Sequence, residues 1–166
     1  YFQNQEFKKA IVEYNTAIQA DPGFAKGHYQ LAQAYLRTAQ PKEAFAEFSK
    51  TVDLDPDHLD AQLKLGQFYL AGKKTEEAGE KANLVLEKDP KNIDALCLQS
   101  GVFLRAGRLS DAVLSLEKIA TLDAKNTRAF ISLARIAESG NRFDEAGRFL
   151  SQALEAHPED AAVRLE

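Results

Sequence analysis

The sequence predicts an all-α protein, a solenoid of stacked antiparallel helix pairs, and two observations carry this prediction. The first is a period of 34 residues that runs through the chain without an insertion. Prolines mark this period, with Ala124 in the one vacant place: Pro22, Pro56, Pro90 and Pro158. The second is the spacing of apolar residues, three to four apart in two stretches of each period, as on helix faces. Such a period is typical of helical hairpins that pack only on their neighbours.

The period also predicts the domain organisation. With the proline as position 32 of each repeat, the chain is a single array of four full repeats between two partial ones. The boundaries are 1–24 (mainly a second helix), 25–58, 59–92, 93–126, 127–160 and 161–166, the start of a further helix. Because both ends fall inside a repeat, we expect the chain to be a piece of a longer array.

Within each repeat, positions 4, 7, 8 and 11 give the first helix its apolar stripe, and positions 17, 20, 21, 24, 27 and 28 give the second helix its own. Position 20 is alanine throughout: Ala10, Ala44, Ala78, Ala112 and Ala146. Small side chains at this position allow two antiparallel helices to approach closely. We therefore expect the helices of a repeat to cross at these alanines.

Two kinds of residue predict where the helices end. Gly72, Gly107 and the pair Gly140–Asn141 lie between the two stripes and suit a helix end that needs a positive φ. The Asp-Pro pairs at positions 31 and 32 end the second helix, because proline disfavours a helical residue before it. Acidic residues just before position 20, such as Glu43 and Asp111, suit the first turn of the second helix and its dipole.

This pattern closely resembles the tetratricopeptide repeat (TPR) over essentially the whole chain. Repeat 25–58 is the most complete, with these residues of the family pattern: Leu31, Ala32, Tyr35, Ala44, Phe48 and Pro56. Departures weaken single repeats without shifting the register: His28, Ala82, Gln99 and Ala124. The resemblance implies a right-handed superhelix whose first helices line an inner, concave face.

The resemblance also places a candidate peptide-binding site on that concave face, at positions 2, 5, 9, 12 and 13 of the repeats. An apolar row there is rimmed by charged and polar rows, which fits an extended or helical peptide. The candidate residues are Lys26, Tyr29, Gln33, Leu36, Arg37, Asp60, Leu63, Gln67, Leu70, Asp94, Cys97, Leu104, Arg105, Arg128, Ile131 and Arg135.

Arginines give this face a chemical preference. Arg128 and Arg135 stand seven residues apart on one helix face, and Arg105 belongs to the preceding repeat. Guanidinium groups match carboxylates, so an acidic side chain or a chain terminus suits this end. The lysine and asparagine set by which the best-known TPR subgroup holds a partner's terminal carboxylate is absent, since position 5 reads Tyr29, Leu63, Cys97 and Ile131. Binding of chaperone tails is therefore not expected.

Composition narrows the class of partner. The net charge of −4 and the isoelectric point near 5.5 argue against nucleic-acid and anionic-membrane binding, which favour a basic surface. No stretch is apolar enough to insert into a membrane. The single Cys97 forms no internal disulfide and does not distinguish the cytoplasm from an oxidising compartment such as the periplasm. We expect a soluble protein whose partner is another protein or a peptide.

The sequence gives no support for catalysis, a metal or a cofactor. His28, His58 and His157 stand at unrelated repeat positions, and no pair has metal-ligand spacing on one helix. Cys97 has no positionally matched histidine to serve as its base, and no glycine-rich phosphate loop is present. We expect a non-catalytic scaffold that binds no cofactor.

Three alternatives stay open. The chain can be the TPR segment of a larger enzyme or of a secretion or assembly machine whose active domain lies elsewhere. It can also self-associate, because the first predicted helix lacks its hairpin partner and carries an apolar face: Phe7, Ile11, Tyr14 and Ile18. A helical-repeat RNA reader ranks last, since those arrays combine a 35-residue period with a basic face.

Overall fold

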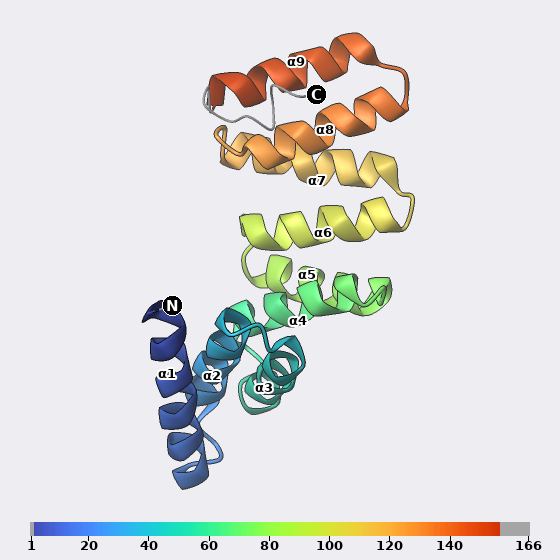
Figure 1. Ribbon diagram of the computed structural model, residues 1–166. Helices are drawn as coiled ribbons and strands as arrows, with labels where there is room; N and C mark the ends of the chain where they lie inside the picture. Colours follow the sequence, from blue (N-terminus) through green and yellow to red (C-terminus); the bar gives the residue numbers. More distant parts are fainter. Residues whose placement is uncertain (1, 157–166) are drawn as a thin grey trace. The chain divides into compact units, whose positions relative to one another are not determined.

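The computed structural model describes residues 2–156, with side chains from residue 5 onward, and this part of the chain contains nine α-helices and no strand. Figure 1 labels them in chain order: α1 (Phe2–Ala20), α2 (Ala25–Arg37), α3 (Pro41–Leu54), α4 (Leu59–Ala71), α5 (Thr75–Lys88), α6 (Ile93–Arg105), α7 (Leu109–Leu122), α8 (Thr127–Ser139) and α9 (Phe143–Ala156). The all-α prediction is confirmed. Tyr1, the Phe2 side chain, His157, Pro158 and the predicted helix start at 161–166 lie outside the described residues.

The helix bounds follow the 34-residue period. Four helices of 13 residues begin at position 1 of a repeat, at Ala25, Leu59, Ile93 and Thr127. Four helices of 14 residues begin at position 17, at Pro41, Thr75, Leu109 and Phe143. The two apolar stripes of each repeat therefore correspond to two separate helices, as the sequence predicted.

The turn after each first helix contains one left-handed residue, always at position 15. The four residues and their φ values are Ala39 (57°), Lys73 (64°), Gly107 (72°) and Asn141 (56°). In each repeat the N–H of position 16 donates to the carbonyl of position 11, with N–O distances of 2.8–2.9 Å, which is the Schellman helix end. The predicted positive φ is thus found at Gly107 and Asn141. In the pair Gly140–Asn141 it is the asparagine that adopts it, since Gly140 has a φ of −95°. The prediction was wrong for Gly72, whose φ is −77°, because the next residue, Lys73, takes the left-handed conformation.

The turns after α1, α3, α5 and α7 are each closed by the aspartate at position 31. Its Oδ1 accepts a hydrogen bond from the backbone N–H two residues later, at 3.0–3.2 Å, and the four aspartates are Asp21, Asp55, Asp89 and Asp123. Asn92 and Asn126 then cap α6 and α8 by accepting from the N–H of Ala95 and Ala129. The aspartate recurs even where Ala124 replaces proline, which explains why α7 ends in register at Leu122.

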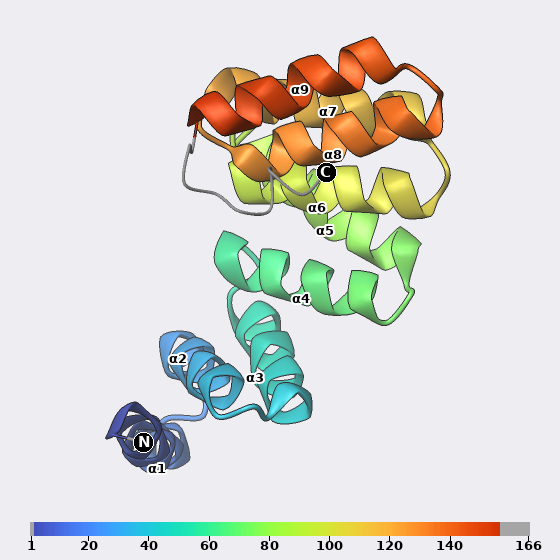
Figure 2. The ribbon, with the colours of Figure 1, turned by 45° about the horizontal axis from the view of Figure 1, so that its top comes forward.

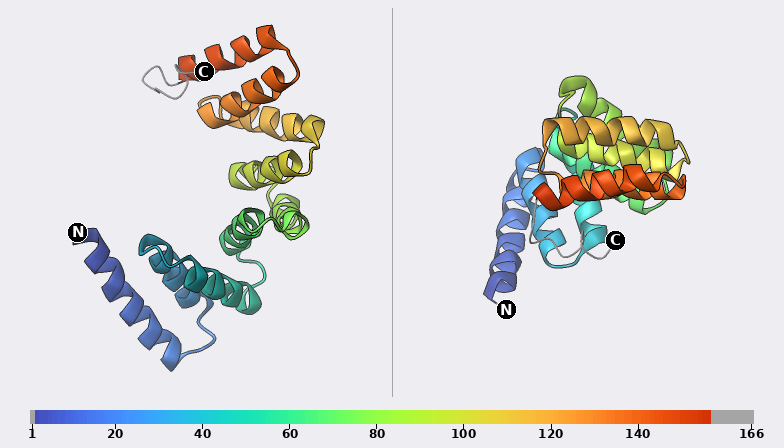
Figure 3. Two further views of the ribbon diagram at one scale, coloured as in Figure 1. Left: turned by 45° about the vertical axis from the view of Figure 1, so that its right-hand side comes forward. Right: turned by 90° about the horizontal axis from the view of Figure 1, so that it is seen from above.

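The helices form two compact units, unit 1 (Tyr1–Lys74) and unit 2 (Thr75–Glu166). Within unit 1, α1 packs on α2, α2 on α3 and α3 on α4. Within unit 2, the successive pairs from α5 to α9 pack in the same way, and Figures 2 and 3 show these neighbours side by side. Each unit therefore has its own core and carries its own candidate surface.

The core of unit 1 centres on Phe48, whose exposed fraction is 0%. The Phe68 ring packs near Phe48 and edge-on against Phe45, with centroids 5.6 Å apart in the second pair. Ala44 and Ala32 are fully buried in this cluster, so the predicted small residues at positions 20 and 8 do let α2 and α3 approach.

Unit 2 repeats the arrangement with aliphatic residues in place of aromatic ones. Leu116, Ile119 and Leu133 form the centre of its main cluster, and Phe149 packs against its edge. Ala112 of α7 is fully buried there, and Ala78 and Ala146 are buried at the equivalent places of α5 and α9. The alanines of position 20 in the four full repeats are thus all buried, as a gapless repeat requires, whereas Ala10 of the partial first repeat is half-buried.

Candidate functional site

The candidate residues of unit 1 come from α2 and α4. Tyr29 of α2 is half-buried, with its ring 4.3 Å from the His58 ring between centroids. Partial burial and the neighbouring Asp60 carboxylate raise the pKa of the Tyr29 hydroxyl, while a hydrogen bond with Gln33 opposes that rise. Tyr29, Gln33 and Asp60 are thereby brought together from the two helices.

A hollow of about 380 Å³ lies beside this group in unit 1. Its lining residues are Gln33, Leu36, Arg37 and Lys64. Leu36 keeps an exposed fraction of 38%, and Arg37 lies with its guanidinium carbon 6.0 Å from the centre of the Phe7 ring of α1. The hollow therefore combines an accessible apolar side chain with two cations and an amide.

Lys64 was not among the predicted site residues. Its Nζ lies 3.5 Å from the Gln67 Oε1 one turn further along α4, so it shares a helix face with a residue that was predicted. The signal that would have found it is this three-residue spacing, because side chains at i and i+3 are neighbours on a helix.

The other candidate residues of unit 1 differ in accessibility. Lys26 and Gln67 are exposed and Leu70 is half-buried. Leu63 has an exposed fraction of only 4%, so its side chain belongs to the interior and offers almost no surface.

In unit 2 the candidate residues come from α6 and α8. The Cys97 residue is partly accessible to solvent, and its thiol is partly desolvated by its neighbours. This partial desolvation and the Asp94 carboxylate raise the pKa of the thiol, while Arg128 opposes the rise. Asp94 and Cys97 of α6 and Arg128 of α8 therefore form one group, in which a cation and an anion flank the thiol.

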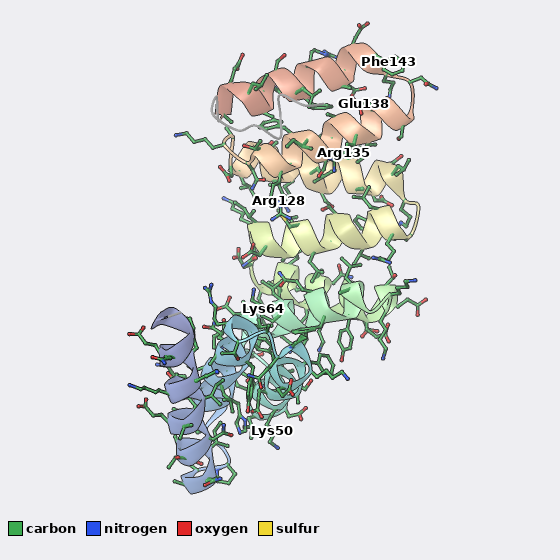
Figure 4. The ribbon with its side chains drawn as sticks, in the orientation of Figure 1. Lys50, Lys64, Arg128, Arg135, Glu138 and Phe143 are labelled. Carbon is green, nitrogen blue, oxygen red and sulfur yellow. The ribbon has the colours of Figure 1, made fainter. Side chains whose placement is uncertain are left out.

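Further residues extend this group along both helices. Ile131 is half-buried and Arg135 is exposed, two turns beyond Arg128 on α8 (Figure 4). Leu104 has an exposed fraction of 38%, and Arg105 ends α6. The face of unit 2 thus carries exposed arginines beside accessible apolar side chains.

Three family profiles match the chain. Two are described as tetratricopeptide repeat and match residues 29–93 and 103–165, and the third, described as TPR repeat, matches residues 1–38. The chain is a tetratricopeptide repeat protein. The solenoid of helix pairs is the architecture of this family, and as a TPR protein the chain is a protein-interaction scaffold.

Solved structures are similar to this TPR protein over nearly its whole length. A crystal structure of MamA has 23% sequence identity, covers 96% of this chain and 94% of its own, and gives a TM-score of 0.84. PilF of Pseudomonas aeruginosa has 20% identity, coverages of 99% and 75%, and a TM-score of 0.82. YrrB, described as a TPR protein with an unusual peptide-binding site, has 19% identity, coverages of 97% and 82%, and a TM-score of 0.80. No curated protein matches the chain in sequence.

One departure from the TPR pattern is explained by its neighbours. Gln99 replaces the usual leucine at position 7, and its Nε2 donates to Asn83 Oδ1 of α5 at 3.2 Å. Its Oε1 accepts from the Ser115 hydroxyl of α7 at 3.1 Å. Because both ends of the amide have partners, a polar side chain is accommodated at a core position of this TPR protein.

The histidines of this TPR protein have structural roles within the described residues. His28 has an exposed fraction of 6%, and its ring nitrogens contact Glu47 Oε2 at 2.6 Å and the Pro22 carbonyl at 3.3 Å. His58 caps α4, where its Nδ1 accepts from the N–H of Ala61. In residues 2–156, no three histidine, cysteine or acidic side chains gather as metal ligands would, and no helix there is both long and apolar enough to cross a bilayer.

Proposed function

We propose that this TPR protein is a non-catalytic scaffold that holds a peptide segment of a protein partner on the faces of its first helices. In unit 1 such a segment lies against α2 and α4, and in unit 2 a segment of the same kind lies against α6 and α8, each face being a site of its own. Each predicted site residue belongs to one of these two faces. Lys64 joins the face of unit 1, and Leu63 is buried beneath that face and does not contact the peptide.

The observation that carries the proposal is the hollow of unit 1. Three of its four lining residues, Gln33, Leu36 and Arg37, belong to the set chosen from repeat positions alone. In a concave site, a few placed polar groups fix the orientation of a bound segment, and here Gln33, Arg37 and Lys64 surround the apolar Leu36. The agreement between the hollow and the set supports peptide binding at this place.

Charge favours an acidic and apolar segment. Arg37 and Lys64 line the hollow of unit 1, and Arg128 and Arg135 are exposed on the face of unit 2. Guanidinium groups bind carboxylates with paired hydrogen bonds, and the accessible Leu36 and Leu104 suit apolar side chains between the acidic ones. The peptide-binding site named for YrrB is consistent with such a role for a similar fold.

Selection of peptides tests this proposal. Random peptides displayed on phage are selected on the full chain, and the affinity of each enriched peptide is measured for variant chains. We expect the enriched peptides to be acidic and apolar. They should bind at least about tenfold more weakly to the double variant Arg37→Glu, Lys64→Glu, or to the single variant Arg128→Glu, than to the unchanged chain. This is a loss of about 1.4 kcal/mol in binding free energy.

Matched charge reversals on second helices serve as controls. Lys50→Glu of α3 (Figure 4) and Lys118→Glu of α7 are charge reversals at exposed positions outside the two faces. Each alone matches the charge change of Arg128→Glu, and the two combined match that of the double variant Arg37→Glu, Lys64→Glu. The proposal requires that these controls keep their affinity within about twofold. If the variants and the controls lost affinity equally, the effect would come from the overall charge of the chain and not from these faces. If no acidic peptide were enriched, the proposal would be wrong.

Self-association through α1 stays a prediction from the sequence. Phe7, Ile11, Tyr14 and Ile18 are each half-buried, and Val12 of the same helix has an exposed fraction of 66%. Sedimentation equilibrium of the chain and of Val12→Glu tests it, since a concentration-dependent mass in the first and a monomer in the second is expected. A monomer at every concentration would exclude it.

A further inference from the structure

Unit 2 has two further hollows at equivalent places of successive repeats. One lies between α7 and the end of α8, and has a volume of about 390 Å³. The other lies between α5 and the end of α6, and has a volume of about 510 Å³. Each α7 residue of the first hollow has its counterpart 34 residues earlier in the second, so that Val113 corresponds to Gly79 and Leu114 to Glu80. Neither hollow shares a residue with the predicted set.

The hollow of α5 is polar and acidic at its rim. Glu76 and Glu80 are exposed and four residues apart, so they stand on one helix face. Among the described residues neither carboxylate has an ion-pair partner. Arg108 also lines this hollow, but its Nε lies 2.7 Å from Asp111 Oδ2 and its guanidinium covers the Phe103 ring at 4.5 Å. The excess charge of the hollow is therefore negative.

The lining of this hollow offers hydrogen bonds as well as charge. Asn83 and Gln99 lie within it, joined by the hydrogen bond at 3.2 Å. The Asn83 amide nitrogen and the second lone pair of its Oδ1 remain available to a ligand. Gly79 leaves the hollow wider than its counterpart, where Val113 occupies the same place.

The hollow of α7 is apolar. Leu114 has an exposed fraction of 65% and Leu109 of 46%, and Val113 and Ile136 lie between them and the core. Accessible large aliphatic side chains gathered around a hollow mark a contact surface more often than scattered ones do.

We propose that these two hollows together form a second docking surface, which binds a segment of a partner protein carrying a lysine or arginine side chain next to a large apolar one. The cationic side chain enters the α5 hollow between Glu76, Glu80 and the Asn83 amide. The apolar side chain packs on Leu109 and Leu114 in the α7 hollow. Charge complementarity selects the basic residue, and the repeat places the two sites at neighbouring positions of unit 2. This surface is separate from the first-helix faces and takes a segment of the opposite charge.

The same peptide selection tests this surface, because its ligands are basic where those of the first-helix faces are acidic. We expect a group of enriched peptides that pair arginine or lysine with leucine, isoleucine or phenylalanine. These peptides bind the double variant Glu76→Lys, Glu80→Lys at least about tenfold more weakly than they bind the unchanged chain. Their affinity for the unchanged chain falls as salt is added. Leu114→Asn weakens them as well, without loss of folding, because the side chain is largely exposed.

Controls on the same helices separate the surface from overall charge. Glu87→Lys lies on α5, is exposed and lines neither hollow, so it keeps the affinity within about twofold. Circular dichroism of each variant checks that the helices are retained. The proposal is overturned if no basic and apolar peptide is enriched, if Glu87→Lys weakens binding as much as the double variant, or if Arg128→Glu is the change that abolishes it. If basic and apolar peptides are enriched but acidic peptides are not, the proposal for this surface is supported and only the proposal for the first-helix faces is contradicted.

Discussion

Ala39 and Lys73 stand 34 residues apart, and both adopt the left-handed conformation, with φ values of 57° and 64°. Each is the residue that follows the first helix of its repeat by two places, where the Schellman turn needs a positive φ. Glycine occupies this place only at Gly107 among the four full repeats. Three repeats therefore carry a side chain where the backbone disfavours one, and only Asn141 among them is a residue type that tolerates this conformation well.

Replacing these residues by glycine is expected to stabilise the protein. Lys73→Gly and Ala39→Gly each raise the free energy of unfolding by about 0.5–1 kcal/mol, since relief of the strained conformation exceeds the extra chain entropy of glycine. Gly107→Ala is expected to lower it by about 1 kcal/mol. Urea unfolding followed by circular dichroism measures all three. A loss of stability in Lys73→Gly would contradict the assigned turn.

A contact between the His28 ring and the Glu47 carboxylate joins α2 to α3. The distance of 2.6 Å joins a nearly buried ring to a carboxylate whose side chain is 25% exposed. Glu47→Ala is expected to lower the free energy of unfolding by about 1–3 kcal/mol, because the buried ring loses its partner. Lys50→Ala of the same helix is the control, since Lys50 is exposed and its removal changes stability by less than about 0.5 kcal/mol. Equal effects of the two changes would contradict the role given to this contact.

Two glycines inside second helices permit a test of helix packing in unit 2. A Cβ at Gly79 would lie 3.5 Å from Val102 Cγ1, an ordinary contact, and a Cβ at Gly147 would meet nothing within 4 Å. Gly79→Ala and Gly147→Ala are therefore each expected to raise thermal stability, by about 0.5–1 kcal/mol in free energy of unfolding. Destabilisation by Gly79→Ala would mean that α5 and α6 approach more closely than the structure has them.

The pKa of the Cys97 thiol depends on the neighbouring charges of Asp94 and Arg128. The Asp94 carboxylate contributes to the raised pKa of the Cys97 thiol, and Arg128 opposes it. Asp94→Asn is therefore expected to lower this pKa and Arg128→Gln to raise it. At a pH below the pKa, alkylation by iodoacetamide becomes faster in the first variant and slower in the second, because the thiolate is the reacting form. Glu117→Gln, exposed on α7, is the control. Identical alkylation profiles in all variants would contradict the grouping of these three residues.

Most of the fold could be predicted because the period fixes which residues are equivalent. The alanines at position 20 and the aspartates at position 31 follow directly from it. In the structure the alanines of the four full repeats are all buried, and Asp21, Asp55, Asp89 and Asp123 each close the same turn. Four copies of the same local pattern reinforce each other, so that Ala124 in place of a proline does not move the end of α7.

What the period could not predict depends on contacts between helices. Leu63 and Cys97 both occupy position 5 of their repeats, yet Leu63 is buried, with an exposed fraction of 4%, and Cys97 is exposed. The hydrogen bonds of Gln99 to Asn83 and Ser115 join three helices. The spacing of residues along the chain does not predict which side chains of different helices come within hydrogen-bonding distance. Lys64 was not predicted because it stands at position 6, which is outside the repeat positions assigned to the concave face, and the hollow that includes it exists only after folding.

The central claim, that the first helices bind an acidic and apolar segment, is tested most directly by nuclear magnetic resonance. An enriched acidic peptide is added to the isotope-labelled chain, and backbone amide shifts are followed to saturation. The account predicts that the largest shifts fall in α2 and α4 around Gln33, Leu36 and Lys64, or in α6 and α8 around Cys97 and Arg128. Largest shifts confined to the second helices α3, α5, α7 and α9 would contradict it.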